Sequence, residues 1–150
     1  MSSTAHSTVD AIQARDADLA RLDRLVGSWD VTGGAAGRVT YRWLEGGYFL
    51  AQDVELVHDG GRTVGLEVIG RERGFGAEQP SDDIVSRYYD SEGNTFDYVY
   101  DLEGDVLTIW GGERGSPAFY RGTFSDGGNA LLGRWEWPGG GYESIARRVE

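Results

Sequence analysis

The stretch Leu25-Val26-Gly27-Ser28-Trp29-Asp30-Val31 divides the chain into two parts that have different hydrophobic periods. Before it, from about Asp10 to Val26, apolar residues recur at the three- and four-residue spacings of an amphipathic helix. After it, short runs of β-branched and aromatic residues alternate with polar ones, which is typical of half-buried strands. The sequence therefore predicts one N-terminal helix followed by an all-β domain.

The predicted helix has one apolar side, which is formed by Ile12, Leu19, Leu22, Leu25 and Val26. Ser7 or Thr8 can cap its start, and Gly27 suits its end. We expect this helix to plug one end of a barrel; a helix that binds a partner is the alternative. Residues 1–9 are mostly small and polar, and they are predicted to form a disordered tail in front of a single domain, 10–150.

Ten strands are predicted after the helix, and glycine-rich turns separate most of them. Their bounds are Ser28–Thr32, Arg38–Leu44, Tyr48–His58, Arg62–Arg73, Ile84–Asp90, Thr95–Leu102, Val106–Gly111, Ala118–Phe124, Ala130–Trp137 and Tyr142–Val149. Short connections make consecutive strands antiparallel neighbours, and closure removes the exposed edges of such a sheet. The fold class is thus a closed up-and-down barrel of about ten strands. The long connection Gly74–Asp83 is either a mobile flap beside an opening or an inert surface loop.

Alternation along the strands indicates which side chains face the inside of the barrel. In Thr95–Leu102 the side chains of Phe96, Tyr98 and Tyr100 oppose acidic ones, so the aromatic rings are predicted inside. The same reasoning places inside Val39, Tyr41, Trp43, Leu50, Gln52, Val54, Leu56, Leu131, Trp135 and Trp137. The strand Val106–Gly111 is ambiguous, because either Val106, Thr108 and Trp110 or Leu107 and Ile109 could point inward.

An aromatic interior with polar tips suits a ligand pocket, since flat apolar walls give affinity and a few polar groups fix orientation. The candidate ligand-binding residues are Tyr41, Trp43, Gln52, Tyr98, Tyr100, Trp110 and Trp135. A buried Gln52 requires a hydrogen-bond partner, either from the protein or from a ligand. The same aromatic residues could also fill the barrel as a solid core. Ten strands nevertheless make a barrel that is wide for side chains alone.

The composition limits the partners and the compartment. A net charge of −11 and the lack of a basic stripe argue against nucleic acid. The chain has no cysteine, which excludes disulfides, zinc thiolates and a cysteine nucleophile. We see no signal peptide and no apolar run of membrane-spanning length, so a cytoplasmic protein without a membrane partner is expected. The sequence leaves the choice between a monomer and a homodimer open.

The Gly27-x-Trp29 motif, placed after one helix and before a run of hairpins, resembles the opening of calycin barrels, the lipocalins and fatty-acid-binding proteins. The resemblance implies that Trp29 closes one barrel end against an arginine of the last strand. Arg147 and Arg148 are the two residues that could supply this contact. A cation over an indole face is the physical basis of such a closure.

From about Leu19 to Val149 the chain also resembles a bacterial lipocalin-like family of uncharacterised proteins. The matching stretches are LDRLVGSWDV, WLEGGYFLAQ, GLEVIGRE and YRGTFSDGGNALLGRWEW. Nitrobindin-like barrels of this superfamily hold haem through a late histidine, but the histidines here are His6 and His58, at neither of which an interior ligand is expected. The final strand also lacks the Arg-x-Tyr pair with which fatty-acid-binding proteins hold a carboxylate. We therefore predict no haem, no other cofactor and no fatty-acid specificity.

Few residues have the pattern of a catalytic or metal site. His58 in a turn is a poor general base for a serine nucleophile, and Asp82-Asp83 resembles ordinary solvated acids more than a cation site. Glu67 is the one catalytic candidate. Because Leu66 and Val68 favour the opposite face, Glu67 is expected to point outward. If it points inward, burial would raise its pKa into a range useful for acid–base chemistry.

Three hypotheses about function follow. The first is a barrel that binds a small hydrophobic or aromatic molecule without a defined catalytic activity. The second is a small isomerase or cyclase that uses a buried carboxylate or tyrosine. The third is a protein-interaction module whose barrel is solid. A cavity inside the barrel separates the first two hypotheses from the third.

Overall fold

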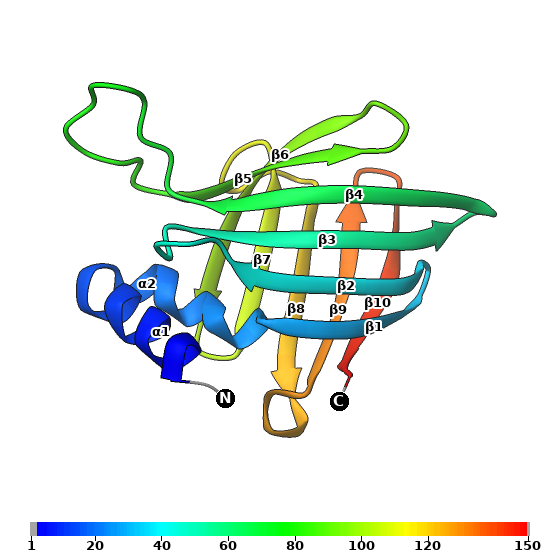
Figure 1. Ribbon diagram of the computed structural model, residues 1–150. Coiled ribbons are helices and arrows are strands. Elements are labelled where there is room, and N and C mark those ends of the chain that lie inside the picture. Colours follow the sequence, from blue (N-terminus) through cyan, green and yellow to red (C-terminus); the bar gives the residue numbers. More distant parts are fainter. Residues whose placement is uncertain (1–2, 150) are drawn as a thin grey trace.

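Ten strands form one closed antiparallel barrel, in which every strand pairs with its neighbours in sequence and β1 pairs with β10 (Figure 1). The computed structural model describes the backbone of residues 3–149 and the side chains of residues 8–149. The strands are β1 (Gly27–Gly33), β2 (Ala36–Trp43), β3 (Phe49–His58), β4 (Gly61–Gly70), β5 (Ile84–Asp90), β6 (Thr95–Glu103), β7 (Val106–Gly111), β8 (Phe119–Ser125), β9 (Ala130–Trp137) and β10 (Gly140–Arg148). The predicted fold class is therefore confirmed.

The predicted strand bounds agree closely with the structure except at the end of β4. Strands β5, β7 and β9 have the predicted bounds, whereas β4 ends at Gly70 instead of Arg73. Arg71 leaves the sheet because its guanidinium binds the Asp16 carboxylate, with a nitrogen–oxygen distance of 2.7 Å. A contact over such a separation in sequence cannot be read from the alternation within one strand.

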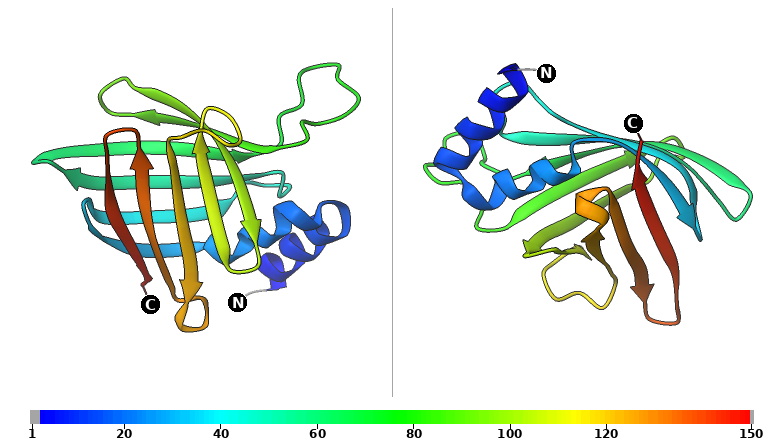
Figure 2. Two further views of the ribbon diagram at one scale, coloured as in Figure 1. Left: turned by 180° about the vertical axis from the view of Figure 1, so that it is seen from behind. Right: turned by 90° about the horizontal axis from the view of Figure 1, so that it is seen from below.

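The up-and-down topology gives the barrel two different ends. Strands β1–β4 cross in front of β7–β10 at a steep angle in Figure 1, and both views in Figure 2 show the helices at one end only. The helix end also carries the β2–β3, β4–β5, β6–β7 and β8–β9 connections. The opposite end, here called the hairpin end, carries the β1–β2, β3–β4, β5–β6, β7–β8 and β9–β10 connections.

The N-terminal segment is three short pieces and not one continuous helix. They are α1 (Ser3–Arg15), α2 (Ala17–Ala20) and the 3₁₀ helix η1 (Arg21–Leu25). Asp16 breaks the helix because it adopts a non-helical backbone and its carboxylate accepts a hydrogen bond from the Leu19 amide at 3.1 Å. The prediction of a single helix from Asp10 to Val26 is therefore wrong.

The start of α1 also differs from the prediction. The helix begins at Ser3 and thus runs through most of the segment predicted as a disordered tail, so Ser7 and Thr8 do not cap it. Met1 and Ser2 lie outside the described residues. Among the described residues, no helix is long and apolar enough to cross a membrane.

The helices close their end of the barrel with the apolar side that the sequence predicted. Ile12, Leu19, Leu22 and Leu25 are buried in one cluster with apolar residues of the barrel such as Leu50, Trp29 and Ile69. Complete burial of such a side chain contributes roughly 1.5–3 kcal/mol. Burial of this cluster therefore fixes the plug in the barrel end.

Arg148 and Trp29 pack together at the helix end. The Arg148 guanidinium lies 4.2 Å from the centroid of the Trp29 ring and donates hydrogen bonds to the carbonyls of Val26 and Arg24. Gly27 has φ +118°, and a Cβ there would lie 2.9 Å from the guanidinium. Arg147, the other residue considered for this contact, is exposed on the outside.

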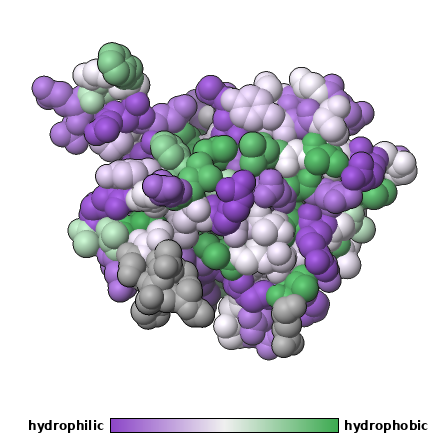
Figure 3. Space-filling view, viewed as in Figure 1, coloured by the Kyte–Doolittle hydropathy of each residue, from purple (hydrophilic) through white to green (hydrophobic). Residues whose placement is uncertain are grey.

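The outer face of β3–β5 is unusually apolar. Phe49, Val64, Leu66 and Tyr89 are each exposed there by more than a third. Figure 3 shows apolar side chains gathered in a band over β4. On this side of the barrel, apolar character does not distinguish the inside from the outside.

Candidate functional site

A cavity of about 350 Å³ lies inside the barrel. It opens toward the hairpin end, because its wall runs from the fully buried Tyr100 to Trp137, which is 43% exposed. The helix end is closed by the packed cluster described above. The wall is formed by Val31, Val39, Tyr41, Gln52, Val54, Leu56, Glu67, Tyr88, Tyr98, Tyr100, Leu107, Ile109, Tyr120, Leu131, Trp135, Trp137, Tyr142, Ser144 and Ala146.

A row of polar side chains crosses the wall on four adjacent strands. In the strand register Tyr41 lies opposite Gln52, Gln52 opposite Glu67, and Glu67 opposite Tyr88. Gln52 Nε2 donates to the Tyr41 hydroxyl oxygen at 2.8 Å. The buried amide thus has a protein partner for its nitrogen, as its burial requires.

Glu67 is the centre of this polar row. Its Oε2 accepts hydrogen bonds from Ser86 Oγ at 2.5 Å and from the Tyr100 hydroxyl at 2.8 Å. Burial raises the pKa of the Glu67 carboxyl above its ordinary value, and the two hydrogen bonds oppose part of that rise because they stabilise the ionised form. Burial and the nearby Glu67 likewise raise the pKa of the Tyr41 and Tyr100 hydroxyls.

Several polar atoms of the wall are available to a ligand. Among the described residues, no side-chain nitrogen or oxygen that is sealed from solvent lacks a hydrogen-bond partner. Glu67 Oε1, Gln52 Oε1 and the Tyr98 and Tyr120 hydroxyls make no protein hydrogen bond among the contacts of the described residues. These atoms are therefore in reach of solvent or a ligand through the cavity.

Glycines make room for two of the tyrosines in the wall. The Tyr120 ring lies across Gly122 and Gly133, which face each other on β8 and β9, and a Cβ on Gly133 would come within 2.4 Å of the hydroxyl. Tyr88 covers Gly65 in the same way, because a Cβ on Gly65 would lie 2.5 Å from Cε1 of the Tyr88 ring. The glycines of these strands thus set the orientation of the aromatic rings.

Five of the seven predicted ligand-binding residues line the cavity, namely Tyr41, Gln52, Tyr98, Tyr100 and Trp135. Phe96 is on the same face of β6 as Tyr98 and Tyr100, but it lies beyond the cavity wall. It is 48% exposed there and stacks on Tyr88. Trp43 and Trp110, the other two candidates, do not line the cavity.

Each of these two tryptophans has a structural contact elsewhere. Trp43 lies at the helix end, where its Nε1 donates to Asp23 at 2.8 Å and joins β2 to η1. Trp110 lies on the outer face of β7 beneath Arg114, at 5.0 Å from the ring centroid. The ambiguity of β7 is resolved in favour of Leu107 and Ile109, which are the inward residues.

Glu67 points inward, contrary to the expectation, and is only 5% exposed. The prediction assumed that the apolar Leu66 and Val68 mark the inner face of β4. In the structure they lie on the outside, where Leu66 pairs in register with Asp53 and Tyr89. In this part of β4 the apolar side chains therefore lie outside and the carboxylate lies inside, which is the reverse of the usual arrangement in a strand.

Tyr88 and Tyr120 line the cavity, although neither is among the residues predicted from the sequence to do so. A usable signal was present in both strands. Arg87 and Arg121 each alternate with these tyrosines, and a charged residue next in sequence marks the outer face. As in β6, the charged residues of β5 and β8 mark the outer face, so the alternating Tyr88 and Tyr120 are indicated as inward residues.

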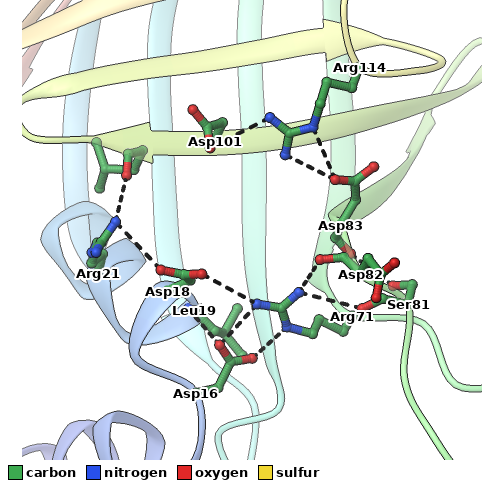
Figure 4. A network of polar contacts seen from close by, with 11 residues as sticks. Asp16, Asp18, Leu19, Arg21, Arg71, Ser81, Asp82, Asp83, Asp101 and Arg114 are labelled. Carbon is green, nitrogen blue, oxygen red and sulfur yellow. Dashed lines mark hydrogen bonds and ion pairs between the residues drawn. The ribbon is translucent and has the colours of Figure 1, made fainter.

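The segment Gly74–Asp83 does not flank the mouth of the cavity. It lies at the helix end, where Arg71 binds Asp16 and the carbonyls of Ser81 and Asp82 (Figure 4). The prediction of a flap beside the opening is therefore wrong for the main cavity.

The same charged network borders a smaller hollow of about 180 Å³. Arg114 reaches Asp83 at 2.9 Å and Asp101 at 3.7 Å, so these acids are ion-paired (Figure 4). Tyr100 lines both spaces and separates the hollow from the cavity.

His58 lies outside the cavity wall. Its Nδ1 is 2.7 Å from the Gly34 carbonyl oxygen, and its ring lies 4.9 Å from the Tyr142 ring. The side chain of His6 lies outside the described residues. The described part of the wall thus offers one carboxyl, one amide, several hydroxyl groups and the indole N–H groups of Trp135 and Trp137.

The fold and the cavity define a class of protein, the up-and-down β-barrel with an internal polar-aromatic cavity. Compared with known proteins, the sequence matches no protein-family model and no curated protein. The geometry of the cavity is therefore the basis for inferring function.

Proposed function

We propose that this protein is a binding barrel that holds a small hydrophobic or aromatic molecule in its cavity. The observation that carries the proposal is the cavity of about 350 Å³ with an aromatic wall and a few polar groups. Ligand pockets usually measure about 300–1,000 Å³ and have this kind of lining. A solid barrel, which the interaction-module hypothesis requires, has no such space.

We also propose a relationship to the lipocalin-like calycin barrels and a cytoplasmic location. The closed ten-stranded barrel with a helix at its start is consistent with the calycin-like fold. The contact between Arg148 and Trp29 supports the same relationship.

Binding can be tested with N-phenyl-1-naphthylamine, a neutral aromatic probe whose fluorescence increases in apolar surroundings. We expect one molecule per chain, with energy transfer from Trp135 in the cavity wall. Ser144→Phe should weaken binding at least tenfold, because Ser144 lines the cavity. Glu143→Phe is the matched control, since the neighbouring Glu143 is exposed and does not line the cavity.

Failure of the wild-type protein to bind the probe, or equal binding by the two variants, would contradict the proposal. Native mass spectrometry of freshly purified protein would in addition reveal a molecule that co-purifies with the chain. Its mass should fit a cavity that would hold about a dozen water molecules at liquid density.

Glu67 supports a second candidate, a small isomerase or cyclase. A carboxyl group of raised pKa, hydrogen-bonded to a tyrosine and open to the cavity through Oε1, has the features of a general acid or base. Exchange of the α-hydrogens of 2-tetralone in heavy water tests this chemistry. Catalysed exchange that Glu67→Gln abolishes would favour the enzyme; equal exchange by both proteins would argue against it.

A further inference from the structure

The charges in the cavity wall constrain the ligand further, and this inference rests on the proposed function. Among the described residues of the wall, Glu67 is the one carboxyl group, and none is arginine, lysine or histidine. A carboxylate or phosphate would therefore enter the cavity without a cationic partner and beside a buried acid. The wall disfavours an anionic ligand, because an unpaired buried charge is costly.

The aromatic rings of the wall favour a cation. The face of a tyrosine or tryptophan ring attracts a positive charge within about 6 Å of its centroid. On the rest of the molecule this preference is used by arginines, for example by Arg15 over Tyr48 at 3.8 Å and by Arg24 over Phe124 at 4.2 Å. None of the rings in the described cavity wall is covered by a protein cation in this way.

Glu67 is held in a geometry that suits a positively charged partner. Ser86 and Tyr100 both donate to Oε2, so the carboxylate has a fixed orientation and its Oε1 is open to the cavity. Gln52, on the adjacent strand and opposite Glu67 in register, contributes a second open acceptor, Oε1. An ammonium group has several N–H donors and can use both acceptors at once.

We propose that the ligand is an organic amine, bound as its ammonium ion between the Glu67 carboxylate and the aromatic faces of the cavity. The apolar part of the ligand then lies toward the hairpin end against Trp135, Trp137 and Leu56. The net charge of −11 also favours a cationic ligand, since it raises the local concentration of cations and repels anions.

Three probes of similar shape test the charge of the head group: 2-phenylethylamine, 2-phenylethanol and phenylacetate, each with a naphthyl analogue. Calorimetry at neutral pH should show the amine binding at least tenfold more tightly than the alcohol, and no binding of the acid. If the alcohols or acids bind as well as the amines, the amine inference fails while the binding barrel stands. If neither these probes nor N-phenyl-1-naphthylamine binds, the proposed function itself fails.

Glu67→Gln separates the carboxylate from the rest of the cavity. The variant should lower affinity for the amine at least tenfold and change affinity for the alcohol less than threefold. Glu143→Gln is the matched control, because it neutralises an exposed carboxylate that does not line the cavity and should leave the preference for the amine intact. Equal losses for amine and alcohol would overturn the assignment of Glu67 as the ammonium partner.

A measurement on the wild-type protein makes the test independent of any variant. The groups that face Glu67 are Ser86, Gln52 and the tyrosines 41, 88, 98 and 100. Burial raises the pKa of these tyrosines, so they stay neutral from about pH 5 to pH 8. Affinity for the amine should therefore rise with pH as Glu67 ionises, and affinity for the alcohol should not; parallel curves would contradict the proposal.

Discussion

Replacing Arg148 with methionine should lower the free energy of unfolding by about 3 kcal/mol. This residue joins the last strand to the first and to the plug. Its guanidinium lies over Trp29 and donates to the carbonyls of Arg24 at 2.7 Å and Val26 at 2.5 Å, with a longer contact of 3.4 Å to Gly128. Three segments of the chain therefore depend on one side chain.

The magnitude follows from these contacts. A cation over an indole face is worth about 1 kcal/mol in a partly buried site. Each of the two shorter hydrogen bonds contributes about 1 kcal/mol net, and the contact to Gly128 is long enough to add little. Methionine retains most of the apolar stem of Arg148, so its packing is kept. In a protein of this size the loss corresponds to a decrease in Tm of about 6–12 °C.

Urea unfolding followed by far-UV circular dichroism measures this difference. Arg147→Met is the matched control, because Arg147 is the next residue on β10 and is exposed. It should change the free energy of unfolding by less than about 0.5 kcal/mol. A loss below about 1 kcal/mol for Arg148→Met, or equal losses for the two variants, would refute the account of barrel closure.

Three more predictions concern other parts of the barrel. Gly133→Ala should lower the free energy of unfolding, measured with urea, by about 1–3 kcal/mol, because the added Cβ would collide with Tyr120. Gly74→Ala is the control and should leave the free energy of unfolding unchanged, because Gly74 lies in open space. Because the pKa of Glu67 is raised in the folded state, its contribution to stability decreases as pH rises from its ordinary value of 4.5 through the raised pKa. The wild-type protein should therefore lose stability relative to Glu67→Gln over that range; a constant difference would contradict this burial effect. Asp16→Asn keeps a helix cap but loses the ion pair to the β4–β5 connection, so limited proteolysis should cut that connection faster, and an unchanged rate would show that the ion pair does not hold it.

The sequence predicts the inside of the barrel well where charges mark the outside. In β6, Asp97 and Asp101 are outward and the inward Tyr98 and Tyr100 reach the cavity. The acids cannot be buried without partners, so the face that they occupy is unambiguous. This rule needs no information beyond the strand itself.

The same rule fails where another part of the chain covers the outside. Val99 and Thr108 are buried although they face outward. Over this face Arg114, from the β7–β8 connection, lies on Trp110 and reaches Asp101. A position that faces a covering loop can be apolar for the same reason as one that faces the core. The misplacement of Trp110 follows from a contact that the periodicity of β7 does not encode.

The break in the N-terminal helix has a similar origin. The apolar spacing continues across Asp16, so a periodic pattern predicts one helix. The break is stabilised by the ion pair with Arg71, which lies 55 positions away in the sequence and positions the start of the β4–β5 connection. Local patterns identified the buried side of the segment but not the point where it bends.

The polar cluster around Glu67 is not needed to close the barrel. Closure comes from the pairing of β1 with β10 and from the apolar plug, neither of which contacts Glu67 through a hydrogen bond. A buried carboxyl group lowers stability relative to an apolar side chain, whereas removing one partner alone would leave the other buried polar groups without hydrogen-bond partners. The triple variant Glu67→Leu/Ser86→Ala/Tyr100→Phe removes the whole cluster. It should unfold at the same or a higher urea concentration than the wild-type protein and lose its preference for amines. A triple variant that is less stable by more than about 2 kcal/mol would instead mean that the cluster holds the barrel together, and the case for a ligand-binding carboxylate would lose its main support.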